Sequence, residues 1–172
     1  MERIFITGNA GSGKTTLSKQ IGKILKRDVI NLDKIVWKPY WSLTPSAERS
    51  VQICNLIKSN RWIIEGVSKD VLKASDTVIF LDYSRRISYW RVLKRNLRYL
   101  FKTRPELPEK CPEILVIKKL IQIIWNFNNK VRPCILDHIE ENKHVKNIFH
   151  IRENSEIKSL LSIIESKASE FN

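Results

Sequence analysis

Glycine is scarce in this chain: only five of the 172 residues are glycine, and three of those five fall between residues 8 and 13. The remainder of the sequence therefore offers few positions at which a backbone could approach a ligand closely. Cysteine is also rare. Cys54, Cys111 and Cys134 form no C-x-x-C pair, so neither a disulfide framework nor a zinc site is indicated, and a reducing, cytoplasmic location is the default expectation.

Several signals of other protein classes are missing. The sequence passes from Met1 directly into a predicted strand without an apolar leader, and the longest apolar run, residues 114–125, is interrupted by Lys118, Lys119 and Gln122. We therefore expect no membrane association. The three histidines have neither metal-ligand nor triad spacing, there is no N-K-x-D guanine motif, and no helix-turn-helix, zinc-finger or RNA-recognition signature is present.

Positive charge, by contrast, is abundant. The formal net charge is +13, which favours association with nucleotides, nucleic acid or other anionic partners but carries no information about the fold. A chain of this length accommodates one α/β domain with a sizeable core and leaves no room for a second full domain.

The strongest motif lies near the amino terminus. Residues 4–7 read as an apolar strand, and the spacing G-x-x-x-x-G-K-[ST] follows at once, met by Gly8, Gly13, Lys14 and Thr15. Successive backbone N–H groups and the start of a helix would surround phosphate oxygens, Lys14 would reach the β- and γ-phosphates, and the Thr15 hydroxyl would bind Mg²⁺. We therefore predict a nucleotide site. Its predicted phosphate-binding residues are Gly8, Asn9, Ala10, Gly11, Ser12, Gly13, Lys14, Thr15 and Thr16.

Strands and helices alternate along the rest of the sequence. Predicted strands occupy about residues 28–32, 62–66, 77–82 and 145–151, and predicted helices occupy about 14–25, 45–57, 69–73, 85–101, 113–128, 133–141 and 155–167. This order predicts right-handed crossovers and a parallel sheet with helices on both faces.

Three predicted strands end in an acid: Asp33, Glu65 and Asp82. Ligands of doubly wound sheets bind beyond the carboxyl ends of the strands. Asp33 is our candidate for orienting an acceptor hydroxyl and accepting its proton, with a helix cap as the alternative. Glu65 suits a water-bridged contact to Mg²⁺, or else a pairing with a neighbouring base. Asp82 is expected to be structural and to pair with the basic helix that follows it.

That helix, residues 85–101, contains six basic residues on its polar faces and no acid, and Lys102 follows it directly. Arg91 and Arg95 are one turn apart, so both can converge on one ligand and stabilise a migrating phosphoryl group. Most of the remaining charge should be a solvated face. Trp37, Tyr40 and Trp41, shortly after Asp33, either stack on a ligand ring or pack a flap against the next helix.

As a set, several short segments resemble the bacterial adenylate kinase-like proteins often labelled DNA topology modulation protein, or FlaR-related. The resemblance extends over nearly the whole chain. The segments that carry it are residues 8–16, 32–39, 61–66, 90–95, 103–106 and 111–113.

This resemblance implies a P-loop NTPase of the nucleoside monophosphate kinase type, with a five-stranded parallel sheet in the order 2-3-1-4-5. It also implies one domain over residues 1–172 with a helical lid or insertion at roughly 98–132. Arg91 and Arg95 look like the family's Arg-x-x-x-Arg pair, the first contacting adenine and the second phosphate, and Arg104 and Arg132 are further lid candidates. Two departures stand out: Glu65 occupies a position where such kinases usually carry Asp, and Asp33 stands where adenylate kinases carry their AMP-binding pattern.

The leading hypothesis is an ATP- and Mg²⁺-dependent kinase for a small hydroxyl- or phosphate-bearing acceptor such as a nucleoside or nucleotide. Lys14, Asp33 and Arg95 are its candidate catalytic residues, Arg91 joins the phosphate-binding loop in holding ATP, and Thr15 and Glu65 hold the metal. The alternative is a nucleotide-gated regulator that binds DNA or RNA through its basic surface. An ATPase switch without an acceptor is a third possibility. The sequence names neither the acceptor nor the oligomeric state.

Overall fold

The parallel sheet is built around a buried strand whose central residues, 4–6, are apolar. In the computed structural model, which describes residues 1–98 and 117–169, this strand is β1 (Arg3–Gly8). The sheet also contains β2 (Val29–Asn31), β5 (Trp62–Glu65), β6 (Thr77–Leu81) and β7 (Asn147–Ile151). Its strand order is β2-β5-β1-β6-β7, and every pairing is parallel. Numbered as the five predicted strands, this is the order 2-3-1-4-5, so the predicted fold class is confirmed.

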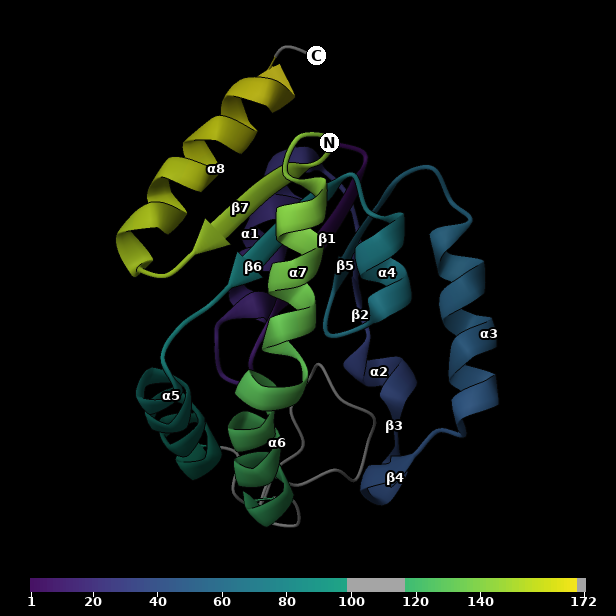
Figure 1. Ribbon diagram of the computed structural model, residues 1–172, viewed down its shortest axis with the longest axis vertical. Helices are drawn as coiled ribbons and strands as arrows, with labels where there is room; N and C mark the ends of the chain where they lie inside the picture. Colours follow the sequence, from purple (N-terminus) through teal and green to yellow (C-terminus); the bar gives the residue numbers. More distant parts are fainter. Residues whose placement is uncertain (99–116, 170–172) are drawn as a thin grey trace.

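Alternating side chains of the strands serve two separate cores, because successive residues of a strand point to opposite faces. Ile4 and Ile6 pack on one face against Leu17 of α1 (Lys14–Leu25) and Leu160 of α8 (Asn154–Ser169). Phe5 packs on the other face. That second face is covered by helices α3 (Ser46–Ile57), α4 (Lys69–Ala74), α6 (Ile117–Lys130) and α7 (Arg132–Asn142). The result is a three-layer sandwich (Figure 1).

The carboxyl ends of the strands meet the remaining elements. In Figure 1 this is the lower end of the molecule, where α5 (Arg85–Arg98), α6 and α2 (Asp33–Val36) gather, while both chain termini lie at the opposite end. A small antiparallel pair, β3 (Trp37–Lys38) and β4 (Ser42–Leu43), follows α2 and is joined by a 3₁₀ turn at Pro39–Trp41. The sequence patterns predicted neither α2 nor this hairpin, because a four-residue helix and two-residue strands are too short to show a period.

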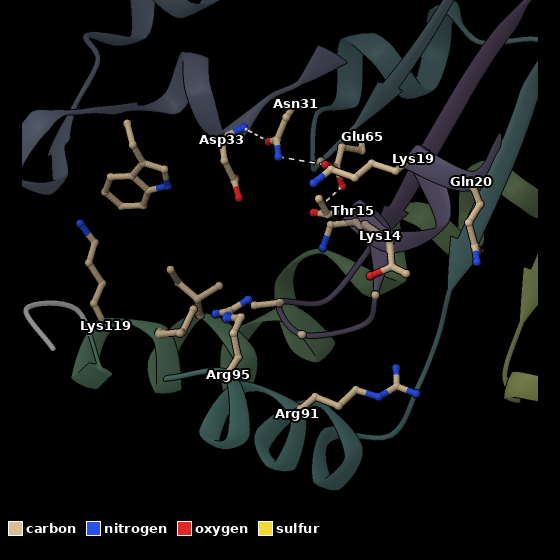
Figure 2. Close-up of a pocket in the computed structure, with 18 of the residues that line it drawn as sticks. Lys14, Thr15, Lys19, Gln20, Asn31, Asp33, Glu65, Arg91, Arg95 and Lys119 are labelled. Atoms are coloured by element: carbon tan, nitrogen blue, oxygen red, sulfur yellow. Dashed lines mark hydrogen bonds between the residues drawn. The ribbon is translucent and has the colours of Figure 1, made fainter. Parts of the chain in front are cut away.

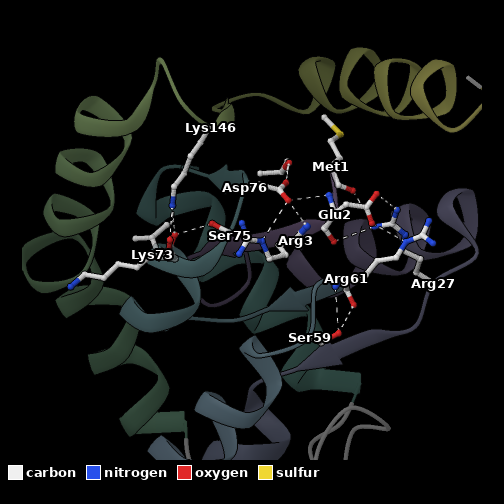
Figure 3. Close-up of polar contacts among 12 residues, drawn as sticks. Met1, Glu2, Arg3, Arg27, Ser59, Arg61, Lys73, Ser75, Asp76 and Lys146 are labelled. Carbon is white, nitrogen blue, oxygen red and sulfur yellow. Dashed lines mark hydrogen bonds and ion pairs between the residues drawn. The ribbon is translucent and has the colours of Figure 1, made fainter. Parts of the chain in front are cut away.

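Polar contacts secure the amino ends of the strands, far from that edge (Figure 3). The Asp76 carboxylate accepts hydrogen bonds from the backbone N–H groups of Glu2 and Arg3, at 3.1 and 2.8 Å. Lys146 donates to the Leu72 and Lys73 carbonyls at the end of α4. These contacts connect β1, β6 and β7 to the adjoining helix, so this end of the molecule is a structural base.

Most predicted boundaries agree with the observed ones within a few residues. The helix predicted from Pro45 begins at Ser46, and the last strand begins at Asn147, two residues later than predicted. Most of the predicted lid, together with Arg104, lies outside the described residues. No helix in the described part of the chain has the length and hydropathy needed to cross a lipid bilayer.

Candidate functional site

The loop between β1 and α1 has the backbone conformation that its glycines allow. Gly11 has φ +76° and Gly13 has φ +97°, both in the left-handed region that favours glycine. A Cβ atom on Gly11 would lie 2.7 Å from Val92 and 2.8 Å from the Ser88 carbonyl oxygen, both in α5. The loop therefore packs directly against α5, with no space for a side chain at Gly11.

The side chains of the loop secure it from within and from α6. Lys14 Nζ donates to the carbonyl oxygens of Gly8 and Asn9, at 2.9 and 2.8 Å. The Asn9 amide is buried and donates to the Ile124 carbonyl of α6 at 3.0 Å, while its oxygen accepts from the Ala10 N–H at 2.7 Å. The loop is thus preformed around the Lys14 ammonium, and α6 is fixed to it through Asn9.

Three side chains and one backbone N–H group form a continuous chain of hydrogen bonds across the carboxyl ends of the strands (Figure 2). Thr15 Oγ1 donates to Glu65 Oε2 at 3.0 Å, and Asn31 Nδ2 donates to Glu65 Oε1 at 2.9 Å. The Asn31 oxygen in turn accepts from the Asp33 N–H at 2.7 Å. Asn31 and Glu65 are register partners in neighbouring strands, which places their side chains side by side. This network connects the phosphate-binding loop to the acid at the start of α2.

The residues proposed for Mg²⁺ suit a hard cation that prefers oxygen ligands. Because the Thr15 hydroxyl donates its proton to Glu65, its lone pairs remain available to a metal. Glu65 is 2% exposed and places its carboxyl oxygens beside that hydroxyl. No group of three acidic, histidine or cysteine ligands occurs within the described ranges, but a magnesium ion shared with nucleotide phosphates needs only one or two protein groups.

A cavity of about 630 Å³ extends from this loop to the β3–β4 hairpin. Asp33 lies in its wall, as do Trp37, Trp41 and Lys119. Trp37 and Trp41 meet edge to face with ring centroids 5.2 Å apart, and the Lys119 Nζ lies 4.4 Å from the centroid of the Trp37 ring. Tyr40 is 65% exposed and is not part of the wall. The two tryptophans therefore pack against each other and line the cavity, and the two roles proposed for the aromatic segment stay predictions.

The two arginines of α5 line the same cavity but differ in their contacts. Arg91 donates to the Ser12 carbonyl at 3.1 Å and to Asn154 Oδ1 at 2.9 Å, and its guanidinium lies 4.5 Å from the Tyr83 ring centroid. In Figure 2 the Arg95 guanidinium points toward the centre of the cavity, whereas that of Arg91 points toward its margin. The one-turn spacing therefore brings both to the loop, with Arg95 directed more toward the space between Lys14 and Asp33.

The prediction for Asp82 was wrong in its partner. Its carboxylate pairs with Arg132 of α7 through two hydrogen bonds of 2.8 and 2.9 Å and contacts His150 Nε2 at 2.8 Å. The basic helix α5 runs away from this carboxylate, whereas the first turn of α7 lies over the end of β6. Burial favours a higher pKa for Asp82, but the hydrogen bonds and charges of Arg132 and His150 hold its pKa below the ordinary value. Arg132, a predicted lid residue, is thus held by Asp82 at the first turn of α7.

Asn31 and Lys119 are two of the cavity residues that had not been predicted. Asn31 stands at the end of a strand, two residues before Asp33, so the rule that singled out strand-end acids could have included it. Lys119 lies in α6 and had no sequence signal beyond interrupting an apolar run. Only folding brings it to the cavity.

Comparison with known proteins agrees with this architecture. No family model and no curated protein matches the sequence. Among solved structures, shikimate kinase from Acinetobacter baumannii in complex with shikimate is similar at 15% identity and a TM-score of 0.63, covering 97% of this chain and 94% of that one. Shikimate kinase from Bacteroides thetaiotaomicron gives 18% identity, a TM-score of 0.53 and 98% coverage of both chains. Deoxyadenosine kinase from M. mycoides with bound dATP gives 16% identity, a TM-score of 0.52, and coverage of 98% and 100%.

The chain therefore has the P-loop fold of the nucleoside monophosphate kinase type. At these identities the likeness concerns the fold, and the chemistry has to be argued from the site.

Proposed function

We propose that this protein is an ATP- and Mg²⁺-dependent phosphotransferase that acts on a hydroxyl group of a small molecule. The observation that carries the proposal is that one cavity contains both the phosphate-binding loop with Lys14 and the Asp33 carboxylate. The similar folds include kinases named for shikimate and deoxyadenosine, which are small molecules with hydroxyl groups. Membership of the DNA topology modulation group stays part of this proposal.

In the proposed reaction, the loop amides and Lys14 hold the β- and γ-phosphates, and Asp33 orients the acceptor hydroxyl. A bond forms between the acceptor oxygen and the γ-phosphorus while the bond from that phosphorus to the β–γ bridging oxygen breaks. The hydroxyl proton passes to the Asp33 carboxylate, and ADP leaves with the bridging oxygen. Arg95 stabilises the charge on the moving phosphoryl group. Thr15 and Glu65 would hold Mg²⁺, which when bound neutralises charge on the phosphates.

We also propose that residues 98–132 act as a lid within a single domain. Support comes from α6, whose residues Lys119, Leu120 and Ile123 line the cavity wall opposite α2. Movement of this helix would break the hydrogen bond from Asn9 to the Ile124 carbonyl and would change the access of water and substrate to the site.

The test is transfer of labelled γ-phosphate from Mg·ATP to a panel of nucleosides, nucleoside monophosphates and hydroxylated metabolites. Lys14→Ala should abolish transfer, while Lys58→Ala, at an exposed lysine directly after the distant helix α3, should not. Asp33→Asn should lower kcat about 100-fold or more with nucleotide binding retained, because it removes the proton acceptor. Undiminished transfer by the Lys14→Ala variant would refute the assignment.

One observation favours the rival function of binding nucleic acid. Arg86, Trp90 and Lys94 lie at successive turns on the exposed face of α5, and Trp90 is 68% exposed. Basic side chains that contact the phosphate backbone, together with an aromatic ring on which a base can stack, are typical of proteins that bind single-stranded nucleic acid. Filter binding of single-stranded and duplex DNA over a salt series, with and without Mg·ATP, tests it. Weak binding at physiological salt, unaffected by Trp90→Ala, would remove this candidate.

A further inference from the structure

Charge is unevenly distributed over the wall of the cavity. Among the residues that the structure describes, six cationic side chains line it, against two acids, Asp33 and Glu65. Mg·ATP would carry a net charge of about −2, which leaves an excess of positive charge in the remaining part of the cavity. An uncharged acceptor would leave that excess unbalanced, whereas an acceptor with an acidic group would neutralise it.

One of these cations, Lys119, lies at the acceptor end. In Figure 2, Asp33 lies between Lys119 and the loop residues Lys14 and Thr15. Lys119 lines the cavity from α6, and Asp33 lines it from the start of α2, so the lysine and the acid lie on opposite sides of the same part of the cavity. Trp37 follows directly after α2 and lines the same wall as Asp33. A molecule whose hydroxyl contacted Asp33 would extend toward Lys119.

The Trp37 ring positions the Lys119 ammonium. The Nζ atom lies 4.4 Å from the ring centroid, within the range of a cation–π interaction. That attraction is electrostatic and does not consume a particular N–H group, so the ammonium can still donate hydrogen bonds to an anion. Within the described ranges no carboxylate forms an ion pair with Lys119. The Trp37 ring in turn packs at a steep angle on the Trp41 ring, with the two centroids 5.2 Å apart.

We propose that the phosphoryl acceptor is an anionic hydroxylated molecule, whose carboxylate or phosphate group binds Lys119 over the Trp37 ring while its hydroxyl contacts Asp33. This inference rests on the proposed kinase function and deepens it. Lys119 is then the residue that selects acidic acceptors, and Trp37 positions it.

The experiment uses three probes of similar size that differ in charge: glucose, gluconate and glucose 6-phosphate. Equilibrium dialysis of each labelled probe is carried out on the full chain with the loop filled by Mg²⁺ and a non-hydrolysable ATP analogue, so that anions do not bind at the phosphate loop. We expect gluconate, glucose 6-phosphate or both to bind roughly tenfold tighter than glucose, as a charge-assisted hydrogen bond implies. The stronger of the two anions identifies the acidic group as carboxylate or phosphate.

Variants make the test specific to Lys119. Lys119→Gln should abolish the preference for the anions, and Lys119→Glu should reverse it in favour of glucose. Lys130→Gln, at an exposed lysine in the last turn of the same helix, should leave it unchanged. Trp37→Leu should reduce the preference, because the ammonium loses its fixed position.

The outcomes separate this proposal from the kinase function on which it rests. Three results would overturn the anionic acceptor: equal binding of the three probes, no binding of any of them, or a preference for the anions that survives in Lys119→Gln. In each case ATP binding and its dependence on Lys14 would be unaffected. Failure of the wild-type chain to bind the ATP analogue would instead overturn the kinase function itself.

Discussion

Removing the Asn31 side chain should weaken both the fold and the site, because this amide joins Glu65 to Asp33. Asn31 donates to a carboxylate that is 2% exposed and accepts from the Asp33 N–H. A hydrogen bond to a charged group contributes about 1.5–3 kcal/mol, and a neutral one about 1 kcal/mol. We therefore expect Asn31→Ala to lower the free energy of unfolding by about 2–3 kcal/mol, allowing for water that enters from the cavity.

A second substitution separates the two halves of the amide. Asn31→Asp keeps the acceptor for the Asp33 N–H but sets a carboxylate against Glu65 Oε1. Two unit charges about 4 Å apart repel by about 4 kcal/mol at an effective dielectric constant of 20. In the absence of metal this variant should be less stable than Asn31→Ala. Added Mg²⁺ should reduce its deficit, since a cation between two carboxylates offsets their repulsion, and should change Asn31→Ala much less.

Urea denaturation followed by tryptophan fluorescence, with and without MgCl₂, measures both effects. Asn55→Ala, at an exposed position of α3, is the matched control and should stay within about 0.5 kcal/mol of the wild type. Two results would refute the reasoning. One is an unfolding midpoint of Asn31→Ala equal to that of the control. The other is a metal-free Asn31→Asp variant that is more stable than Asn31→Ala.

Two further predictions concern the loop and the base of α7. Gly11→Ala should lower the free energy of unfolding by about 2–4 kcal/mol, because it adds left-handed backbone strain and a steric overlap with α5. Gly13→Ala should lower it by about 1–2 kcal/mol in the same urea assay, because its added Cβ would meet only a flexible arginine at 3.8 Å. Equal losses would contradict the close packing on α5. Asp82→Asn should lower stability at pH 7 by about 1–2 kcal/mol by breaking the ion pair with Arg132. Because the pKa of Asp82 is depressed in the folded state, its contribution is complete above the unfolded value of about 3.9 and is lost as the pH falls through the folded value. Thermal melts from pH 7 to pH 2 should therefore show that the melting temperature of this variant falls less steeply with acid than that of the wild type. Parallel curves of melting temperature against pH would contradict the role of Asp82.

Local patterns were enough to predict much of the fold. Fewer than ten residues are enough to recognise the apolar runs of β1, β5 and β6 or the glycine-lysine motif. A buried parallel strand and a phosphate-binding loop each require a characteristic local composition. The resemblance to adenylate kinase-like proteins supplied the strand order, which the structure confirms. Short elements were beyond such patterns, and so α2 and the β3–β4 hairpin were missed.

The sequence by itself determined the phosphate-binding loop and the acids that follow the strands, because each depends on neighbours in the chain. The tertiary structure alone decided which distant groups meet them. Asn31 reaches Glu65 because parallel strands set them in register, Lys119 reaches Trp37 because α6 lies across the cavity, and Asp82 pairs with Arg132 because α7 begins over the end of β6. Such contacts join residues 34 to 82 positions apart, and no local periodicity records them.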